Sequence, residues 1–304
     1  MLKASTGKSK MEKPELLDTW QDFSDYWSQA RSQSVDEQII LWLTLYMKKY
    51  PELLSKQLQT YEEDGLDWKE IAKKIFPSFL NRFPLMQKAR NNIIRVYKPV
   101  YSKTAETLKL HFNITFVVYV GIGCGAGWAT TCKEQPAILL GLENIAEEKW
   151  HTQQKLEGLI SHEIGHLIHM NWRRGRQMFE ETEKDPLFQL YSEGFAQRCE
   201  HIILGKETWH LAEDEKWLSW CKRHKSWLAK EFLKRIKNQM TVKDFFGSWF
   251  NIQGKKQAGY FLGHEFIRAL EETRSLRKIA LLKAEDIRKL GIKYLNTLSN
   301  KTFE

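Results

Sequence analysis

The stretch Ser161-His162-Glu163-Ile164-Gly165-His166 decides the fold and the chemistry expected of this chain. Its two histidines are four residues apart, and on an α-helix such residues lie on the same face, one turn apart. Two imidazoles in that arrangement can bind one Zn²⁺ ion, and the glutamate after the first histidine can reach a water molecule that the metal activates. The order H-E-x-x-H therefore predicts a metal site on a helix.

The residues around this stretch favour a largely buried helix. Apolar residues recur there at helical spacing, and Thr152 is a suitable N-cap before them. At about 100° per residue, His162 and His166 lie about 40° apart at one edge of the apolar stripe, where a cleft could form. The stripe consists of Leu156, Leu159, Ile160, Ile164, Leu167 and Ile168.

A catalytic zinc ion needs a third protein ligand and an open fourth position. The longer motif H-E-x-x-H-x-x-G-x-x-H fails here, because His169 and Trp172 occupy the places of its glycine and last histidine. A glutamate from a later helix is the better candidate: Glu193 lies in an apolar segment, where an unpaired carboxylate would be costly. His169 is the competing ligand, but it shares a helix with His162 and His166 and would crowd the metal.

These residues give the chain a resemblance to the gluzincin clan of zinc metallopeptidases, in which H-E-x-x-H is followed by E-G-x-A, here Glu193-Gly194-Phe195-Ala196. Together with Gly259-Tyr260-Phe261-Leu262-Gly263, the pattern is similar to a bacterial family of predicted zinc-dependent proteases, known mainly as a domain of unknown function. The resemblance covers residues 110–275. It implies a zincin-like fold, zinc held by His162, His166 and Glu193, and Glu163 as general base.

The resemblance also implies a role for Tyr260, as the group that donates a hydrogen bond to the tetrahedral oxyanion. His264, one turn later, is the alternative. One departure concerns the surroundings of the metal, because some members of the clan place an aspartate four residues after the glutamate ligand, where it orients a histidine. This chain has Gln197 at that position, which leaves the partner of that histidine unassigned.

Three short segments before the metal helix are predicted to be β-strands. Residues 113–120 are β-branched and aromatic, and residues 128–131 and 137–141 are two further short runs. They match the small sheet that the resemblance implies beside the active site. An exposed edge strand can bind a substrate peptide by backbone pairing, and we assign this role to Gly127–Thr130, with Gly127, Trp128 and Ala129 as substrate-binding residues. A purely structural hairpin is the alternative.

The remainder of the chain is predicted to be mainly helical. Residues 1–13 are polar and lysine-rich, which is typical of a disordered tail and not of a secretory signal. Residues 14–109 are expected to form an N-terminal helical region that packs on a zincin-like catalytic region, residues 110–304. The expected fold class is therefore α+β, mostly helical, with a small sheet before the H-E-x-x-H helix. Further helices are expected at residues 214–238, 258–272 and 275–298.

Composition limits the other expectations. The formal net charge of +9 lies wholly in residues 205–304, which carry 21 Lys and Arg against 12 Asp and Glu. Such a surface could bind nucleic acid, anionic lipid or an acidic protein, but solvated helix faces are the commoner explanation, so nucleic acid is not an expected partner. The four cysteines form no C-x-x-C pair, which argues against a thiolate zinc site and a disulfide framework. The longest nearly uncharged stretch, residues 112–131, is interrupted by glycines, so no membrane span is expected.

These observations predict a cytoplasmic zinc metallopeptidase that hydrolyses peptide bonds in a peptide or protein substrate, with Zn²⁺ as its cofactor. The alternative is a non-catalytic protein whose zinc site stabilises the fold and whose basic C-terminal helices bind a partner. The presence of Glu163 favours the enzyme, since a structural zinc site has four closed ligands and needs no glutamate base.

Overall fold

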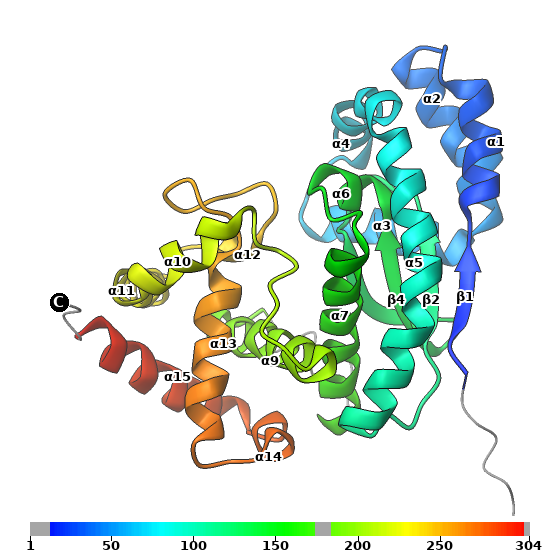
Figure 1. The fold of residues 1–304 in the computed structure, drawn as a ribbon. Helices are drawn as coiled ribbons and strands as arrows, with labels where there is room; N and C mark the ends of the chain where they lie inside the picture. The colour runs from blue at the N-terminus through cyan, green and yellow to red at the C-terminus, as the bar shows by residue number, and fades with distance from the viewer. Residues whose placement is uncertain (1–12, 174–183, 301–304) are drawn as a thin grey trace, which may run out of the picture.

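The computed structural model describes residues 13–173 and 184–300, so the predicted tail at residues 1–13 lies outside the described residues except for Lys13. The described chain is mostly helical with one small mixed sheet, which agrees with the α+β expectation (Figure 1). The strands are β1 (Glu15–Asp18), β2 (Thr115–Tyr119), β3 (Gly127–Cys132) and β4 (Gln135–Gly141). The α-helices are α1 (Trp20–Ala30), α2 (Val35–Leu41), α3 (Pro51–Glu63), α4 (Trp68–Ile75), α5 (Phe79–Leu108), α6 (Leu142–Glu147), α7 (Gln153–Arg173), α9 (Pro186–Leu204), α10 (Glu215–Arg223), α11 (Lys225–Lys237), α12 (Lys243–Phe246), α13 (Ala258–Glu271), α14 (Leu276–Ala280) and α15 (Ala284–Ser299). A π-helical turn at Trp42–Tyr46 and 3-10 turns at Met47–Lys49 and Phe76–Ser78 complete the helical segments of the described residues.

The strand order of the sheet is β1-β2-β4-β3, which makes β3 an edge strand. Strands β1, β2 and β4 are parallel, and β3 is antiparallel to β4, with Gly127 opposite Leu140. The backbone N–H of Gly141 donates to the carbonyl oxygen of Ala126 at 3.1 Å. Since hydrogen-bonded and non-hydrogen-bonded pairs alternate along an antiparallel ladder, the backbone groups of Gly127 and Ala129 face away from β4.

Strand β1 is a difference from the sequence prediction, which assigned residues 14–109 to helices. Glu15–Asp18 pair in parallel with Thr115–Val118, a segment 100 residues further along the chain. Four residues are too few to show the alternation that marks a strand, and nothing local indicates so distant a partner. The helix expected at residues 275–298 is likewise two helices, α14 and α15.

Buried polar contacts fix the N-terminal helices to the end of β2. The Tyr46 hydroxyl accepts the backbone N–H of Val120 at 3.0 Å and lies 2.5 Å from Thr19 Oγ1, which donates to the carbonyl oxygen of Val118. The indole N–H of Trp42 donates to the carbonyl oxygen of Val120 at 3.3 Å. The N-terminal helices therefore pack directly on the sheet.

No helix in the described part of the chain combines the length and apolar character that crossing a membrane requires.

Three long helices position the residues predicted for the metal site. Helix α7 carries residues 161–166, as expected, and the hydroxyl of Thr152 accepts the backbone N–H of Lys155 at its start. Helix α9 packs against both α7 and α13 (Figure 1). Helices α9 and α13 meet backbone to backbone, because a Cβ atom on Gly194 would lie only 2.1 Å from the carbonyl carbon of Gly263. This contact brings α13 beside the middle of α9.

Candidate metal centre

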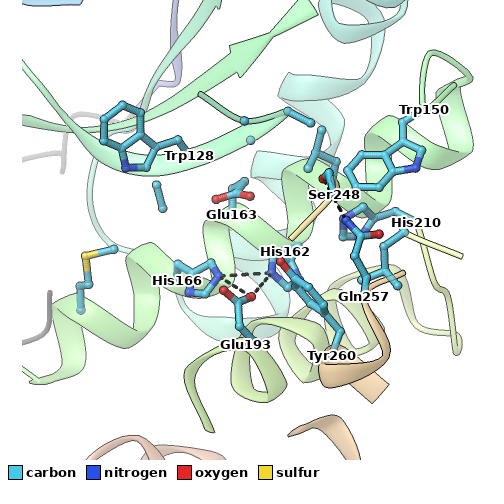
Figure 2. A pocket seen from close by; sticks show the side chains of 17 residues that line it. Trp128, Trp150, His162, Glu163, His166, Glu193, His210, Ser248, Gln257 and Tyr260 are labelled. Carbon is cyan, nitrogen blue, oxygen red and sulfur yellow. Dashed lines mark hydrogen bonds and ion pairs between the residues drawn. The ribbon is translucent and has the colours of Figure 1, made fainter. Parts of the chain in front are cut away.

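The three side chains predicted as metal ligands converge on one point. His162 and His166 project from α7, and Glu193 projects from α9 (Figure 2). The Nε2 atom of His162 is 3.2 Å from Nε2 of His166 and 3.2 Å from Oε2 of Glu193, and the remaining distance, from Nε2 of His166 to the same oxygen, is 3.4 Å. In a tetrahedral zinc site with bonds of about 2.05 Å, two ligand atoms lie about 3.3 Å apart. The three atoms therefore fit one face of a zinc tetrahedron.

The protonation states of these groups also suit a metal. Burial lowers the pKa of His162 to about 4, so its ring is neutral at physiological pH. Burial alone would raise the pKa of Glu193, but the neighbouring His166 and His162 outweigh it and hold that pKa well below its usual range. A neutral imidazole and a charged carboxylate are the forms that offer lone pairs to a metal.

His169, the competing ligand, belongs to the packing between α7 and α9. Its Nε2 atom is 3.2 Å from the hydroxyl of Tyr191, and its ring stacks on Phe195 with the ring centroids 4.2 Å apart. Burial lowers the pKa of His169 well below its usual value. His169 is absent from the described residues that line the cavity at the metal centre, so its geometry supports the choice of Glu193.

Glu163 lies against the edge strand β3. Its carboxylate accepts the backbone N–H of Ala129, and a Cβ atom built on Gly127 would come within 2.5 Å of its Oε1 atom. Glycine at position 127 therefore leaves room for the glutamate. Burial raises the pKa of Glu163 to about 7, although the nearby His166 opposes this shift. A carboxyl group with a pKa near neutrality can both accept and donate a proton at physiological pH.

A cavity of about 260 Å³ opens at these side chains (Figure 2). The ring of Tyr260, on α13, borders it, with its centroid 5.5 Å from that of His162. All the residues predicted for the site line this one cavity, although their roles stay predictions. They are His162, Glu163, His166, Glu193, Tyr260, Gly127, Trp128 and Ala129.

The alternative to Tyr260, His264, lies elsewhere. It lines a different cavity together with basic residues of α9 and α10, and its ring centroid is 4.5 Å from that of His201. Position on the helix explains the difference, because His264 is four residues after Tyr260 and so one turn further from the metal centre. Only Tyr260 of this pair borders the metal cavity.

Sequence reasoning missed a buried pair beside the metal centre, His210 and Glu200. The Nδ1 atom of His210 is 2.7 Å from Oε2 of Glu200, whose side chain is fully buried. The ring centroid of His210 is 5.2 Å from that of His162. Burial alone would raise the pKa of Glu200, but His210 lowers it. Residue 210 lies in the connection between α9 and α10, where no periodic pattern marks a histidine as part of a site.

Gln197, where the chain departs from the pattern of the clan, bonds to groups other than the predicted metal ligands. The side-chain amide of Gln197 donates to the carbonyl oxygen of Thr208 at 2.9 Å. Glu200, two turns of α9 after Glu193, instead has a carboxylate oxygen within 4.8 Å of a ring nitrogen of His162. Nδ1 of His162 makes no hydrogen bond with any described residue, so the partner that would orient this ring stays unassigned. His162, Glu200 and His210 form a second buried group whose ligand atoms could hold a metal ion. Trp150, Ser248 and Gln257 are further lining residues that were not predicted.

No protein-family model matches this chain, and comparisons with curated proteins and with solved structures found no similar protein.

Proposed function

We propose that this protein is a zinc-dependent peptidase of the gluzincin type, with a zincin-like arrangement of edge strand, metal helix and glutamate helix. The observation that carries the proposal is the spacing of 3.2, 3.2 and 3.4 Å between the ligand atoms of His162, His166 and Glu193. A second glutamate, Glu163, lines the same cavity without belonging to that set. Three ligands leave a fourth coordination position free, which is typical of catalytic zinc sites.

The metal and Glu163 divide the chemistry between them. Zinc held by the three side chains would supply a Lewis acid that polarises the scissile carbonyl group and lowers the pKa of water. Glu163 accepts a proton from the attacking water as the water oxygen bonds to the carbonyl carbon. It then donates that proton to the leaving amine as the C–N bond breaks.

Tyr260 and β3 complete the proposed site. The hydroxyl of Tyr260 donates a hydrogen bond to the developing oxyanion, an interaction typically worth about 2.7–4 kcal/mol of the barrier. The outward backbone groups of Gly127 and Ala129 pair with an extended peptide, as sheet edges do. The N–H of Ala129 already donates to Glu163, so the strand positions the base and offers its remaining groups to the substrate.

The test is hydrolysis of a quenched fluorescent peptide library by the purified chain, first stripped with a chelator and then reloaded with Zn²⁺. Hydrolysis should appear only with the metal. The variant Glu163→Gln should bind as much zinc as the wild type and lose at least about 10²-fold in rate, the typical contribution of a general base. An equal rate in this variant, or no hydrolysis by the zinc-loaded wild type, would refute the peptidase.

The same experiment separates the alternative function, a zinc-stabilised protein that binds a partner through its basic C-terminal helices. That protein would hold zinc and gain thermal stability from it, yet cleave no peptide. No feature of the metal cavity among the described residues favours this alternative over the enzyme, because Glu163 and Tyr260 line the cavity beside the three ligands.

A further inference from the structure

A second cavity adjoins the metal cavity, and Gly127 and Trp128 line both. One wall of the second cavity is a face of helix α3, in the N-terminal helical region. The spacing of the α3 residues that line it, i, i+3, i+4 and i+7, places them on one side of the helix. They are Lys56, Gln59, Thr60 and Glu63, which we call the α3 face; Asp64, directly after the helix, and Lys184 also line this cavity.

Helix α3 is held firmly beside β3. The hydroxyl of Tyr61 donates to the carbonyl oxygen of Ile122 at 2.6 Å, and the N–H of Ile122 donates to Oε1 of Gln57 at 3.2 Å. After β3, the backbone N–H of Lys133 donates to Glu52 at 2.9 Å. These bonds tie α3 to the loop before the edge strand and to the turn after it. The wall is therefore fixed relative to the strand.

We propose that the α3 face forms the outer part of the substrate groove, so that the substrate is an extended polypeptide contacted several residues away from the scissile bond. This inference rests on the proposed function. A peptide paired with the edge of β3 advances about 3.3 Å per residue. Because the two cavities meet at Gly127 and Trp128, a chain on this edge continues from the metal cavity past the indole to the α3 face.

The charges of the outer cavity indicate what Glu63 recognises. Asp64 pairs with Lys243 at 3.4 Å, and Lys56 lies 3.9 Å from Glu52. Among the described residues Glu63 has no ion-pair partner; the side-chain amide of Gln59 donates to it at 2.8 Å. Glu63 also ends α3, where the negative end of the helix dipole favours a cation. A basic side chain of the substrate is the group that Glu63 should bind.

The test measures peptide binding in the Glu163→Gln background, so that hydrolysis does not consume the probe. Fluorescent decapeptides carry either Lys or Glu at one position, which is moved along the peptide, and binding is followed by fluorescence anisotropy. At one position outside the metal cavity, the peptide with Lys should bind about threefold to tenfold more tightly than the peptide with Glu. An exposed ion pair with Glu63 favours Lys, and repulsion between like charges disfavours Glu by a similar free energy. The preference should reverse in Glu63→Lys and shrink at high salt.

Glu62→Lys is the matched control, since it makes the same charge change at an exposed neighbour that does not line the cavity. It should leave the preference unchanged. Equal effects of the two variants, or no reversal in Glu63→Lys at any position, would overturn the α3 groove. Hydrolysis of short peptides by the wild type is measured separately. Cleavage of these peptides without charge coupling at residue 63 would refute the groove and leave the peptidase standing.

Discussion

The carboxylate of Glu163 lies against the Cα atom of Gly127, so the proposed general base and the proposed substrate strand are in direct contact. The base is therefore positioned by β3 as well as by its own helix, since Ala129 of the same strand donates its backbone N–H to the carboxylate. Any change that moves the edge strand should move the base with it.

Gly127→Ala should disturb this contact without touching the metal ligands. The new Cβ atom would lie 2.5 Å from Oε1 of Glu163 and 2.8 Å from its Cγ and Cδ atoms, so the glutamate side chain must rotate away. We expect kcat/KM to fall about tenfold or more, part of the 10²–10⁴-fold that a general base supplies, with zinc content unchanged. Cys132→Ala, at the other end of β3, is the control, and wild-type kinetics in Gly127→Ala would contradict the arrangement.

Elemental analysis should show that zinc content depends on the three predicted ligands and not on His169. His162→Ala and Glu193→Ala each remove one of three converging ligand atoms, and we expect them to lose most of the bound zinc. His169→Gln should retain close to one zinc per chain, because its ring contacts Tyr191 and Phe195. Loss of zinc in His169→Gln together with its retention in Glu193→Ala would exclude the gluzincin ligand set.

Loss of the Tyr260 hydroxyl should lower the turnover rate and leave substrate affinity little changed. Tyr260→Phe keeps the ring beside His162 but removes the hydroxyl that donates to the oxyanion. We expect kcat to fall about 10²–10³-fold with KM little changed, as for loss of one oxyanion donor. His264→Gln is the comparison, and because His264 lines another cavity, its kcat per folded molecule should stay at the wild-type level. The opposite ranking of the two variants would show that the assignment of Tyr260 is wrong.

The contact between Gly194 and Gly263 should be essential for packing α9 against α13. A Cβ atom on Gly263 would lie 2.2 Å from the carbonyl oxygen of Leu190, a backbone atom that cannot rotate away. Gly263→Ala should therefore lower the free energy of unfolding by about 1–3 kcal/mol or more, the usual cost of overpacking, and weaken zinc binding because Glu193 precedes Gly194. Gly291→Ala, whose nearest neighbour is a Leu187 methyl group at 3.1 Å, should be tolerated in the same denaturant titration.

Glu143 should make stability depend on pH. Burial raises the pKa of its carboxyl group to about 7, although the backbone N–H of Gly123 donates to it at 3.1 Å. The folded state thus keeps a proton that the unfolded state releases near its ordinary pKa of 4.5. This contribution to stability falls as the pH rises from about 4.5 to about 7 and is constant above that range. Urea titrations at pH 5 and pH 8 should show a loss of stability in the wild type. The part due to Glu143, on the order of 1–3 kcal/mol, should be missing in Glu143→Gln, whereas the part due to Glu163, whose pKa burial also raises to about 7, should remain. Equal pH dependence in the wild type and the variant would exclude a contribution from Glu143.

The parts of the site that could be predicted from the residues themselves are those encoded locally, whereas Tyr260 was assigned from the resemblance alone. One helix carries His162, Glu163 and His166 within little more than one turn. Glu193 lies in an apolar segment, where a buried carboxylate is costly unless it is paired or bound to a metal. The pair of His210 and Glu200 and the α3 face depend on contacts between distant segments, which no local periodicity records. The two edges of the sheet show the same contrast, because β3 lies in a recognisable hairpin with β4, whereas β1 has no local partner.

The pairing of β1 with β2 has a consequence for biosynthesis. Glu15–Asp18 leave the ribosome before their partner Thr115–Val118, which is made 100 residues later. At a synthesis rate of about 5–20 residues per second, this delay amounts to roughly 5–20 s. During that time helices α1 to α5 can form from local contacts, while β1 stays unpaired. Its pairing with β2 closes the loop between the two strands, and the entropic cost of closing a loop increases with its length. The strand that completes one edge of the sheet is synthesised before its partner and can pair only after helices α1 to α5 have been made.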